Sequence, residues 1–261
     1  MSISPKSIIV TGASRGIGRA TTLQLLQHFN SNVVAVARSG KDLNDLKLYV
    51  EKDLGLKGKL EIVEGDLTEN KVVEQVVQKS LDTWGSLDGI IANAGVLGPG
   101  KIADTNVQDW KRGFDVNFFS VITLFQKAIP HLRNSKGRII TVSSGGAFNN
   151  YDGWGLYCTS KAGLLMLTNC IASEEPDIIA LSILPGVVDT KMQQDVRENG
   201  SQYMRPDQHE KYVELYKGKK LVNPELPGYV MAALVSGGAT KEMSGKFYDY
   251  NDEKLADFQK K

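Results

Sequence analysis

The chain has 261 residues, of which 41% are hydrophobic and 23% are charged, with 31 basic and 30 acidic side chains. This composition is typical of a globular protein long enough to bury a substantial core. A net charge of +1 without long runs of one sign argues against nucleic acid or an anionic membrane as the main partner. No segment approaches the ~20 apolar residues of a membrane helix. Two cysteines and three scattered histidines form neither a disulfide framework nor a metal-ligand pattern, so we expect a cytoplasmic protein without a bound metal.

Short β-branched runs alternate with longer stretches of helical period along the chain, starting with a strand pattern at 7–11 and a helix pattern at 16–29. The short runs are hydrophobic at successive positions, which is typical of strands covered on both faces. The pattern therefore predicts an α/β fold with a doubly wound (Rossmann) parallel sheet of about seven strands and helices on both faces. The expected strands are 7–11, 32–37, 60–63, 87–92, 138–142, 178–184 and a run ending at 249.

The stretch from about 186 to 223 is irregular in pattern and rich in Lys, Gln, Tyr and Met. It is long for a connection between a strand and the next helix, and connections of this length tend to be functional lids. No composition break, linker or repeat divides the chain. We therefore expect one domain over 1–261, with a substrate lid at about 186–223.

The segment Thr11–Gly18 (TGASRGIG) lies where the first strand ends and the first helix begins. Glycine suits this position because the turn is tight and the backbone must approach a phosphate closely. The helix N-terminus adds free N–H groups and a positive dipole, which favour a bound pyrophosphate. Since the spacing G-x-x-x-G-x-G differs from the G-x-G-x-x-G fingerprint, a plain strand-to-helix turn is the alternative interpretation.

Tyr157 and Lys161 stand four residues apart in a helical pattern, so both side chains project from one face. A neighbouring ammonium favours the phenolate, and we expect it to lower the pKa of the tyrosine toward working pH. Ser144 follows the strand predicted at 138–142 and lies at the same sheet edge as the glycine turn. Asn117 is a polar residue among phenylalanines, for which a satisfied core amide is the alternative interpretation.

Together these motifs resemble those of the short-chain dehydrogenase/reductase family, and the resemblance covers nearly the whole chain. It implies an oxidoreductase that uses a nicotinamide cofactor. Tyr157 would donate a proton to the substrate's carbonyl oxygen, which Ser144 would orient through a hydrogen bond. Lys161 would bind the ribose and lower the pKa of the tyrosine, and Asn117 would hold a proton-relay water.

The end of the second predicted strand carries Arg38 but no acidic side chain, and Arg15 projects from the glycine turn toward the same region. A carboxylate there would bind a ribose 2′-hydroxyl, whereas two guanidiniums suit a 2′-phosphate. We therefore expect NADP(H) rather than NAD(H), with two solvated arginines as the alternative. The expected cofactor-binding residues are Gly12, Ser14, Arg15, Gly16, Ile17, Gly18, Arg38, Ser39, Asp66, Leu67, Asn93, Ala94, Gly95, Tyr157, Lys161, Pro185, Gly186, Val188 and Thr190.

Three of these assignments depend on the resemblance. Asp66 resembles the family's aspartate beside the adenine ring, with the N-cap of the next helix as an equal alternative. Asn93 lies in the sequence ANAG, which departs by one residue from the family's NNAG, and its expected role is structural as much as cofactor-contacting. Thr190, in the sequence PGVVDT, would contact the nicotinamide carboxamide.

Aromatic and soft side chains gather within 145–154 and after residue 186, namely Phe148, Tyr151, Trp154, Met192, Tyr203 and Met204. A mostly apolar cleft with a few polar anchors suits a small or aromatic carbonyl compound, although some of these residues could simply pack the lid. Segments such as 115–120 (DVNFFS) and 153–161 are similar to fungal benzil reductases and to sepiapterin reductases. Both groups reduce a ketone beside another oxygenated carbon.

The resemblance therefore implies reduction of a vicinal dicarbonyl such as benzil to a 2-hydroxyketone, with a pterin side-chain ketone as the alternative. The expected substrate-binding residues are Ser144, Trp154, Tyr157, Met192 and Asp249. In sepiapterin reductases an aspartate matching Asp249 anchors the pterin, and a solvated carboxylate is the alternative. A protein that only senses NADPH is a less favoured hypothesis, because no catalytic residue is missing.

Association is also implied by the resemblance. Members of the family commonly pair through the two helices that correspond to about 106–132 and 157–173, so we expect a homodimer or homotetramer. Apolar residues of these helices either lie at that interface or face the sheet, and they include Phe125, Ile129, Leu165 and Leu167.

Overall fold

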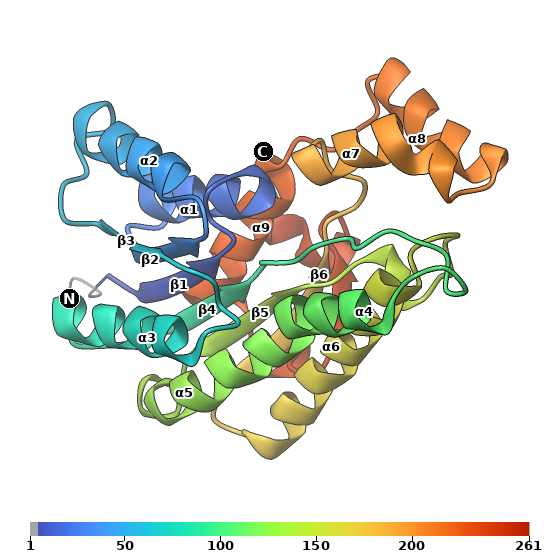
Figure 1. The fold of residues 1–261 in the computed structure, drawn as a ribbon. Helices are drawn as coiled ribbons and strands as arrows, with labels where there is room; N and C mark the ends of the chain where they lie inside the picture. Colours follow the sequence, from blue (N-terminus) through green and yellow to red (C-terminus); the bar gives the residue numbers. More distant parts are fainter. Residues whose placement is uncertain (1–4, 261) are drawn as a thin grey trace.

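The computed structural model describes residues 5–260 as a seven-stranded parallel sheet between two layers of helices (Figure 1). The strand order is β3-β2-β1-β4-β5-β6-β7, and every neighbouring pair is parallel. This arrangement confirms the predicted fold class. The strands are β1 (Ser7–Thr11), β2 (Asn32–Ala37), β3 (Leu60–Glu64), β4 (Gly89–Ala92), β5 (Arg138–Val142), β6 (Ile179–Leu184) and β7 (Phe247–Asp249).

The two faces of the sheet are covered by different helices. On one face lie α1 (Gly16–His28), α2 (Gly40–Lys52) and α9 (Glu225–Ala233), which bury Leu25, Leu46 and Met231 in a first core. On the other lie α3 (Asn70–Trp84), α5 (Ser120–Ser135) and α6 (Gly155–Glu174), which bury a second core around Val76 and Phe125. Because both faces are covered, the continuous hydrophobicity of the strands has its expected physical cause.

The strand order reverses between β1 and β4, which pair with each other although two strands separate them in the sequence. The connections on either side of this point run to opposite faces of the sheet, so the loops at the carboxyl ends of the strands diverge there. Ligands of open α/β sheets bind in the crevice at this place.

One helical stretch was expected from about 106 to 132, and the structure has helix over Val107–Ser135 with a change of winding inside it. The helix α4 (Val107–Phe114) passes into a π-helical turn at Asp115–Phe119 and continues as α5. Such π-helical turns are rare, and they are frequent at functional sites. Asn117 lies in this turn and is buried.

The stretch 186–223 differs from the expectation of an irregular connection because it contains two helices, α7 (Lys191–Asn199) and α8 (Pro206–Lys217). In Figure 1 they form the orange projection beside the carboxyl ends of the strands. Within residues 5–260, no helix is long and apolar enough to span a membrane. Short 3₁₀- or π-helical segments lie at Gly145–Ala147, Gly200–Gln202, Leu234–Gly238, Lys241–Met243 and Glu253–Phe258.

Candidate active site

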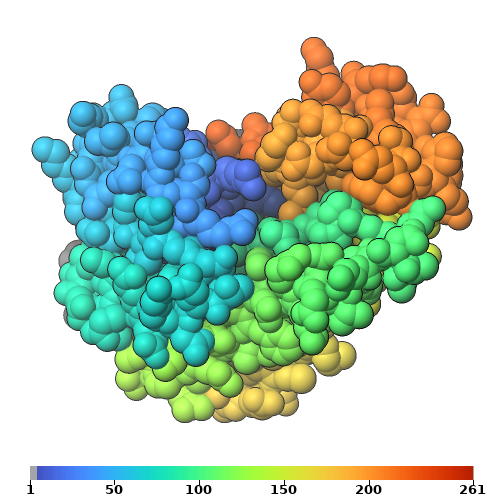
Figure 2. All heavy atoms as spheres, viewed as in Figure 1, coloured from blue at the N-terminus to red at the C-terminus, as the bar shows by residue number. Residues whose placement is uncertain are grey.

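A cleft of about 810 Å³ opens at the carboxyl ends of the strands. Figure 2 shows the surface hollowed between the blue N-terminal part of the chain and the orange α7–α8 segment. The predicted site residues come together here, since all of them line the cleft except Gly18 and Asn117. These two contribute from behind its wall, through the glycine turn and through Val96.

The glycine turn requires its glycines for two separate reasons. Gly12 and Gly16 have φ angles of 65° and 53°, in the left-handed region that favours glycine. A Cβ on Gly18 would lie 2.3 Å from the carbonyl oxygen of Gly12, so no side chain fits there. Arg15, the residue before α1, makes no side-chain cap, which leaves the N–H groups of the first helical turn available to an anion.

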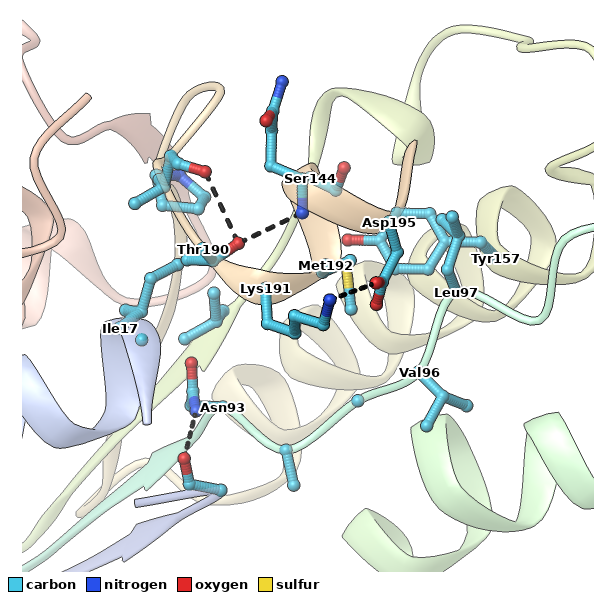
Figure 3. Close-up of a pocket in the computed structure, with 18 of the residues that line it drawn as sticks. Ile17, Asn93, Val96, Leu97, Ser144, Tyr157, Thr190, Lys191, Met192 and Asp195 are labelled. Carbon is cyan, nitrogen blue, oxygen red and sulfur yellow. Dashed lines mark hydrogen bonds and ion pairs between the residues drawn. The ribbon is translucent and has the colours of Figure 1, made fainter. Parts of the chain in front are cut away.

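Asn93 fastens the turn to the end of β4. Its Nδ2 donates to the carbonyl oxygens of Thr11 and Gly12 at 2.9 and 3.3 Å. In return, the hydroxyl of Thr11 accepts from the backbone N–H groups of Asn93 and Ala94, both at 2.9 Å. Asn93 therefore has the local structural role expected of it, and Figure 3 shows it on the floor of the cleft.

Ser144, Tyr157 and Lys161 line the other part of the same cleft. Ser144 follows β5, and its Oγ accepts from the N–H of Gly146 at 3.1 Å, which turns the hydroxyl proton away from that partner. Lys161 is buried, and its Nζ donates to the carbonyl oxygen of Val142 at 2.7 Å while lying 5.8 Å from the centroid of the Tyr157 ring. Strand end and helix thus bring a hydroxyl, a phenol and an ammonium into one site.

The pKa of Tyr157 departs from the expectation that Lys161 would lower it. Burial raises the pKa of this phenol above its usual value, and a hydrogen bond with Ser144 acts in the opposite direction. Burial also lowers the pKa of Lys161, to about 8. Desolvation is the largest influence on the pKa of Tyr157, and the phenol stays protonated near neutral pH.

Asn117 uses its amide to tie two segments together. Its Oδ1 accepts from the N–H of Val96 at 2.8 Å, and its Nδ2 donates to the carbonyl oxygen of Val96 at 2.9 Å and to the Ser160 hydroxyl at 3.0 Å. Asn117 is therefore a buried amide with hydrogen-bond partners, as its alternative interpretation expected. Its implied role toward a relay water stays a prediction.

The two remaining motif residues have local partners as well. Oδ1 of Asp66 accepts from the N–H and the hydroxyl of Thr68 at 3.0 and 2.9 Å, whereas the residue that precedes α3 is Glu69. The alternative that Asp66 caps that helix is therefore wrong. Thr190 is the N-cap of α7, with its Oγ1 accepting from the N–H of Gln193 at 3.4 Å, and it lines the cleft (Figure 3).

One end of the cleft is aromatic. Trp154 packs against the rings of Tyr151, Tyr157 and Tyr212, at centroid distances of 4.9, 5.9 and 5.5 Å. Tyr203 and Met192 pack in the same cluster, and both line the cleft, as does Asp249. Phe148 and Met204 do not, since Phe148 is half exposed against Phe247 and Met204 is buried in a cluster with Tyr203 and Tyr212.

Sequence reasoning missed several residues that line the cleft, among them Leu97, Gln193, Asp195 and Tyr212. Tyr212 and Gln193 lie on helices within a segment that was expected to be irregular, so no helical face could be assigned to them. Leu97 could have been found from its place, because it follows the ANAG segment directly.

Comparison with known proteins identifies the class. The short chain dehydrogenase family model matches residues 6–201. The chain is 40% identical to a benzil reductase ((S)-benzoin forming) of Saccharomyces cerevisiae, over 97% of this chain and 99% of that one. It is 30% identical to a benzil reductase ((S)-benzoin forming) of Bacillus cereus, over 87% and 91%. A crystal structure of a short chain dehydrogenase/reductase from S. cerevisiae, 35% identical, aligns over 98% of this chain and all of that one with a TM-score of 0.92.

The chain therefore belongs to the short-chain dehydrogenase/reductase family, and it is an oxidoreductase acting on carbonyl or hydroxyl groups of small molecules. The family uses a nicotinamide dinucleotide, and the residues present fit one. The glycines leave no room for side chains beside the uncapped start of α1, and the buried Lys161 lines the same cleft.

Proposed function

We propose that the protein is an NADPH-dependent carbonyl reductase that acts on vicinal dicarbonyl compounds such as benzil and forms 2-hydroxyketones. The observation that carries this proposal is that Ser144, Tyr157 and Lys161 line the same cleft as the glycine turn. The apolar, aromatic end of the cleft and the similarity to two benzil reductases support the substrate class.

Bound NADPH would supply the hydride that reaches the carbonyl carbon. Tyr157 would donate its proton to the carbonyl oxygen, and its raised pKa keeps that proton available. The Ser144 hydroxyl would stabilise the negative charge that develops on the same oxygen. Lys161 would bind the ribose, and its side chain is held in place by the carbonyl oxygen of Val142.

The preference for NADPH is supported by charge at the start of the cleft. Arg15 and Arg38 both line it, and neither guanidinium forms an ion pair with another side chain of residues 5–260. Two such groups can bind a 2′-phosphate through paired N–H donors. Asp42, at the first turn of α2, also lines the cleft, and its carboxylate opposes the preference.

The test is consumption of NADPH with benzil by the purified protein, followed by identification of the product. Tyr157→Phe removes the proton donor, and we expect at least a thousandfold loss of kcat with NADPH binding retained in a fluorescence titration. Turnover of the Phe variant near that of the unmodified protein would refute the assignment.

A pterin ketone is the second candidate, and the position of Asp249 favours it. This carboxylate lines the cleft at the end of β7 and forms no ion pair within the described residues. It could accept two parallel N–H bonds from a pterin ring. In that case the protein reduces sepiapterin, and Asp249→Asn lowers this activity much more than activity on benzil, which offers no donor. Equal effects on both substrates would leave only the dicarbonyl proposal.

We further propose that the whole chain forms one domain with α7 and α8 as a lid over the substrate. A homodimer or homotetramer would pair through α4–α5 and α6. Phe119, in the π-helical turn between α4 and α5, and Met166, in α6, are 52% and 61% exposed, whereas Phe125 is buried in the core. Light scattering at micromolar concentration tests this association.

The free thiols of Cys158 and Cys170 agree with a reducing, cytoplasmic location.

A further inference from the structure

The cleft is lined by four basic side chains of residues 5–260, and three of them have a place in the proposed complex. Arg15 and Arg38 would bind the 2′-phosphate, and Lys161 would bind the ribose. The pyrophosphate that joins the two halves of the cofactor carries two negative charges. A cationic side chain would strengthen the binding that the N–H groups of the glycine turn provide. The fourth basic side chain, Lys191, takes no part in the proposed reaction.

Lys191 begins α7 beside the glycine turn. The residue before it, Thr190, lies so close to Gly16 that a Cβ on this glycine would be 3.1 Å from the threonine methyl carbon. Adjacent Cα atoms are ~3.8 Å apart, and the stem of a lysine side chain is long and flexible. Lys191 can therefore bring its ammonium to the start of α1, where the pyrophosphate of a dinucleotide binds.

In the structure this ammonium is paired with carboxylates of its own helix. Nζ of Lys191 lies 3.0 Å from Oδ1 of Asp195 and 3.9 Å from Oε2 of Glu198. Figure 3 shows the pair with Asp195 in the cleft, which both residues line. The two side chains are 46% and 51% exposed, and an exposed pair within one helix is weak. A pyrophosphate is a stronger partner for the ammonium, because it carries two charges and offers several acceptor oxygens.

We infer that Lys191 binds the pyrophosphate of the nicotinamide cofactor and that Asp195 competes with the cofactor for its ammonium. When the ammonium turns to the pyrophosphate, the Asp195 carboxylate is left to water, which its exposure permits. The inference is independent of the proposed substrate and of the choice between NADPH and NADH, because both cofactors contain the pyrophosphate. Bound cofactor would thereby hold the first residue of α7, and with it one end of the proposed lid.

The experiment measures the Kd for NADPH and for NADH by fluorescence titration in the unmodified protein, Lys191→Met, Asp195→Asn and the double variant. We expect Lys191→Met to raise both Kd values about tenfold, which is the effect of one lost charge-assisted hydrogen bond. Asp195→Asn removes the competitor, so both Kd values should fall about threefold. In the double variant the asparagine should have no effect, because the ammonium for which Asp195 competes is gone.

Lys217→Met and Glu214→Gln are the matched controls. These residues form an exposed ion pair at 3.2 Å on α8, and neither lines the cleft. Each variant should leave both Kd values within about twofold of those of the unmodified protein.

Three results would overturn the inference. An unchanged Kd in Lys191→Met, with the native circular dichroism spectrum, would show that the ammonium does not reach the cofactor. A rise for NADPH alone would place Lys191 at the 2′-phosphate. An equal effect of Asp195→Asn with and without Lys191 would show that no competition exists. Absence of benzil turnover would instead overturn the proposed function, and it would leave these Kd values unaffected.

Discussion

The two walls of the cleft differ because main-chain atoms form one and side chains form the other. The wall at the glycine turn is backbone, with left-handed glycines and the Asn93 amide bound to main-chain oxygens. The wall on the side of α7 and α8 consists of side chains, chiefly the rings around Trp154. The first has no space for one more carbon at Gly18, whereas the second is an assembly of rings and exposed ion pairs. In the proposed complex, main-chain geometry would fix the position of the cofactor, and side-chain packing that single substitutions can alter would fix that of the substrate.

Among changes to the two walls, the largest effect is expected when the positive charge of the first wall is reversed. Arg38→Asp places a carboxylate where the proposal puts the 2′-phosphate, so NADPH is repelled and the ribose hydroxyl of NADH is bound instead. We expect the ratio of kcat/KM for NADPH to that for NADH to fall about a hundredfold. Lys111→Asp, at an exposed position that does not line the cleft, makes the same charge change and should leave the ratio alone. An unaltered preference in Arg38→Asp would contradict the NADP assignment.

A second prediction concerns the backbone of the same wall. Gly18→Ala sets a Cβ against the carbonyl oxygen of Gly12 and the amide of Asn93, so the turn must shift. We expect the Kd for NADPH to rise at least tenfold in a fluorescence titration. Gly55→Ala is the control, because a Cβ there has nothing within 4 Å; the backbone strain at Gly55 lowers stability without reaching the cofactor. Normal binding by Gly18→Ala would show that the turn adapts.

Lys161 stands between the two walls, and its titration can be measured. Its pKa is lowered from 10.5 to about 8 in the folded protein, so between these values the unfolded chain binds the additional proton. The contribution of Lys161 to the free energy of unfolding therefore rises with pH from about 8 to 10.5, by up to ~3 kcal/mol. Urea unfolding of the protein and of Lys161→Met is measured at both ends of this window. The free energy of unfolding of the variant relative to that of the unmodified protein should be lower at the higher pH. A constant difference would mean that the ammonium is well solvated.

The smallest effect is expected at the contact between Asp152 and Arg205, which ties two segments of the second wall together. Asp152 accepts from the N–H and the guanidinium of Arg205, at 3.3 and 3.2 Å, and its own N–H donates to Gln208. Because the pair is partly exposed, Asp152→Ala should raise the KM for the ketone only about threefold, with the Kd for NADPH unchanged. Lys127→Ala removes an exposed pair with Glu74 far from the cleft and should leave KM as it was. A larger change in kcat than in KM would show that Asp152 acts on the chemistry.

The first wall could be predicted from the sequence because its signals are local. The boundaries expected for β1, β2 and β5 agree with the structure, and TGASRGIG marks the turn within one stretch of chain. The second wall depends on contacts between distant segments, such as Asp152 with Arg205. α7 is mostly polar and buries only Gln193 and Val196, so its sequence offers few apolar positions from which to predict a helix. The raised pKa of Tyr157 could not be predicted from the sequence either, since desolvation depends on the whole surrounding structure.

The π-helical turn at Asp115–Phe119 rotates the buried face of α5 relative to the buried face of α4. Before the turn the buried position is Gly113, and after it the buried stripe runs through Leu124, Phe125, Ala128 and Leu132. The extra residue in the turn lets Asn117 face Val96 while α5 keeps its own stripe on the sheet. A chain shortened by one residue here would recover a regular helix only by rotating one of these two faces away from its partner. The extra residue of the π-helical turn is therefore needed for two contacts at once, that of Asn117 with Val96 and that of α5 with the core.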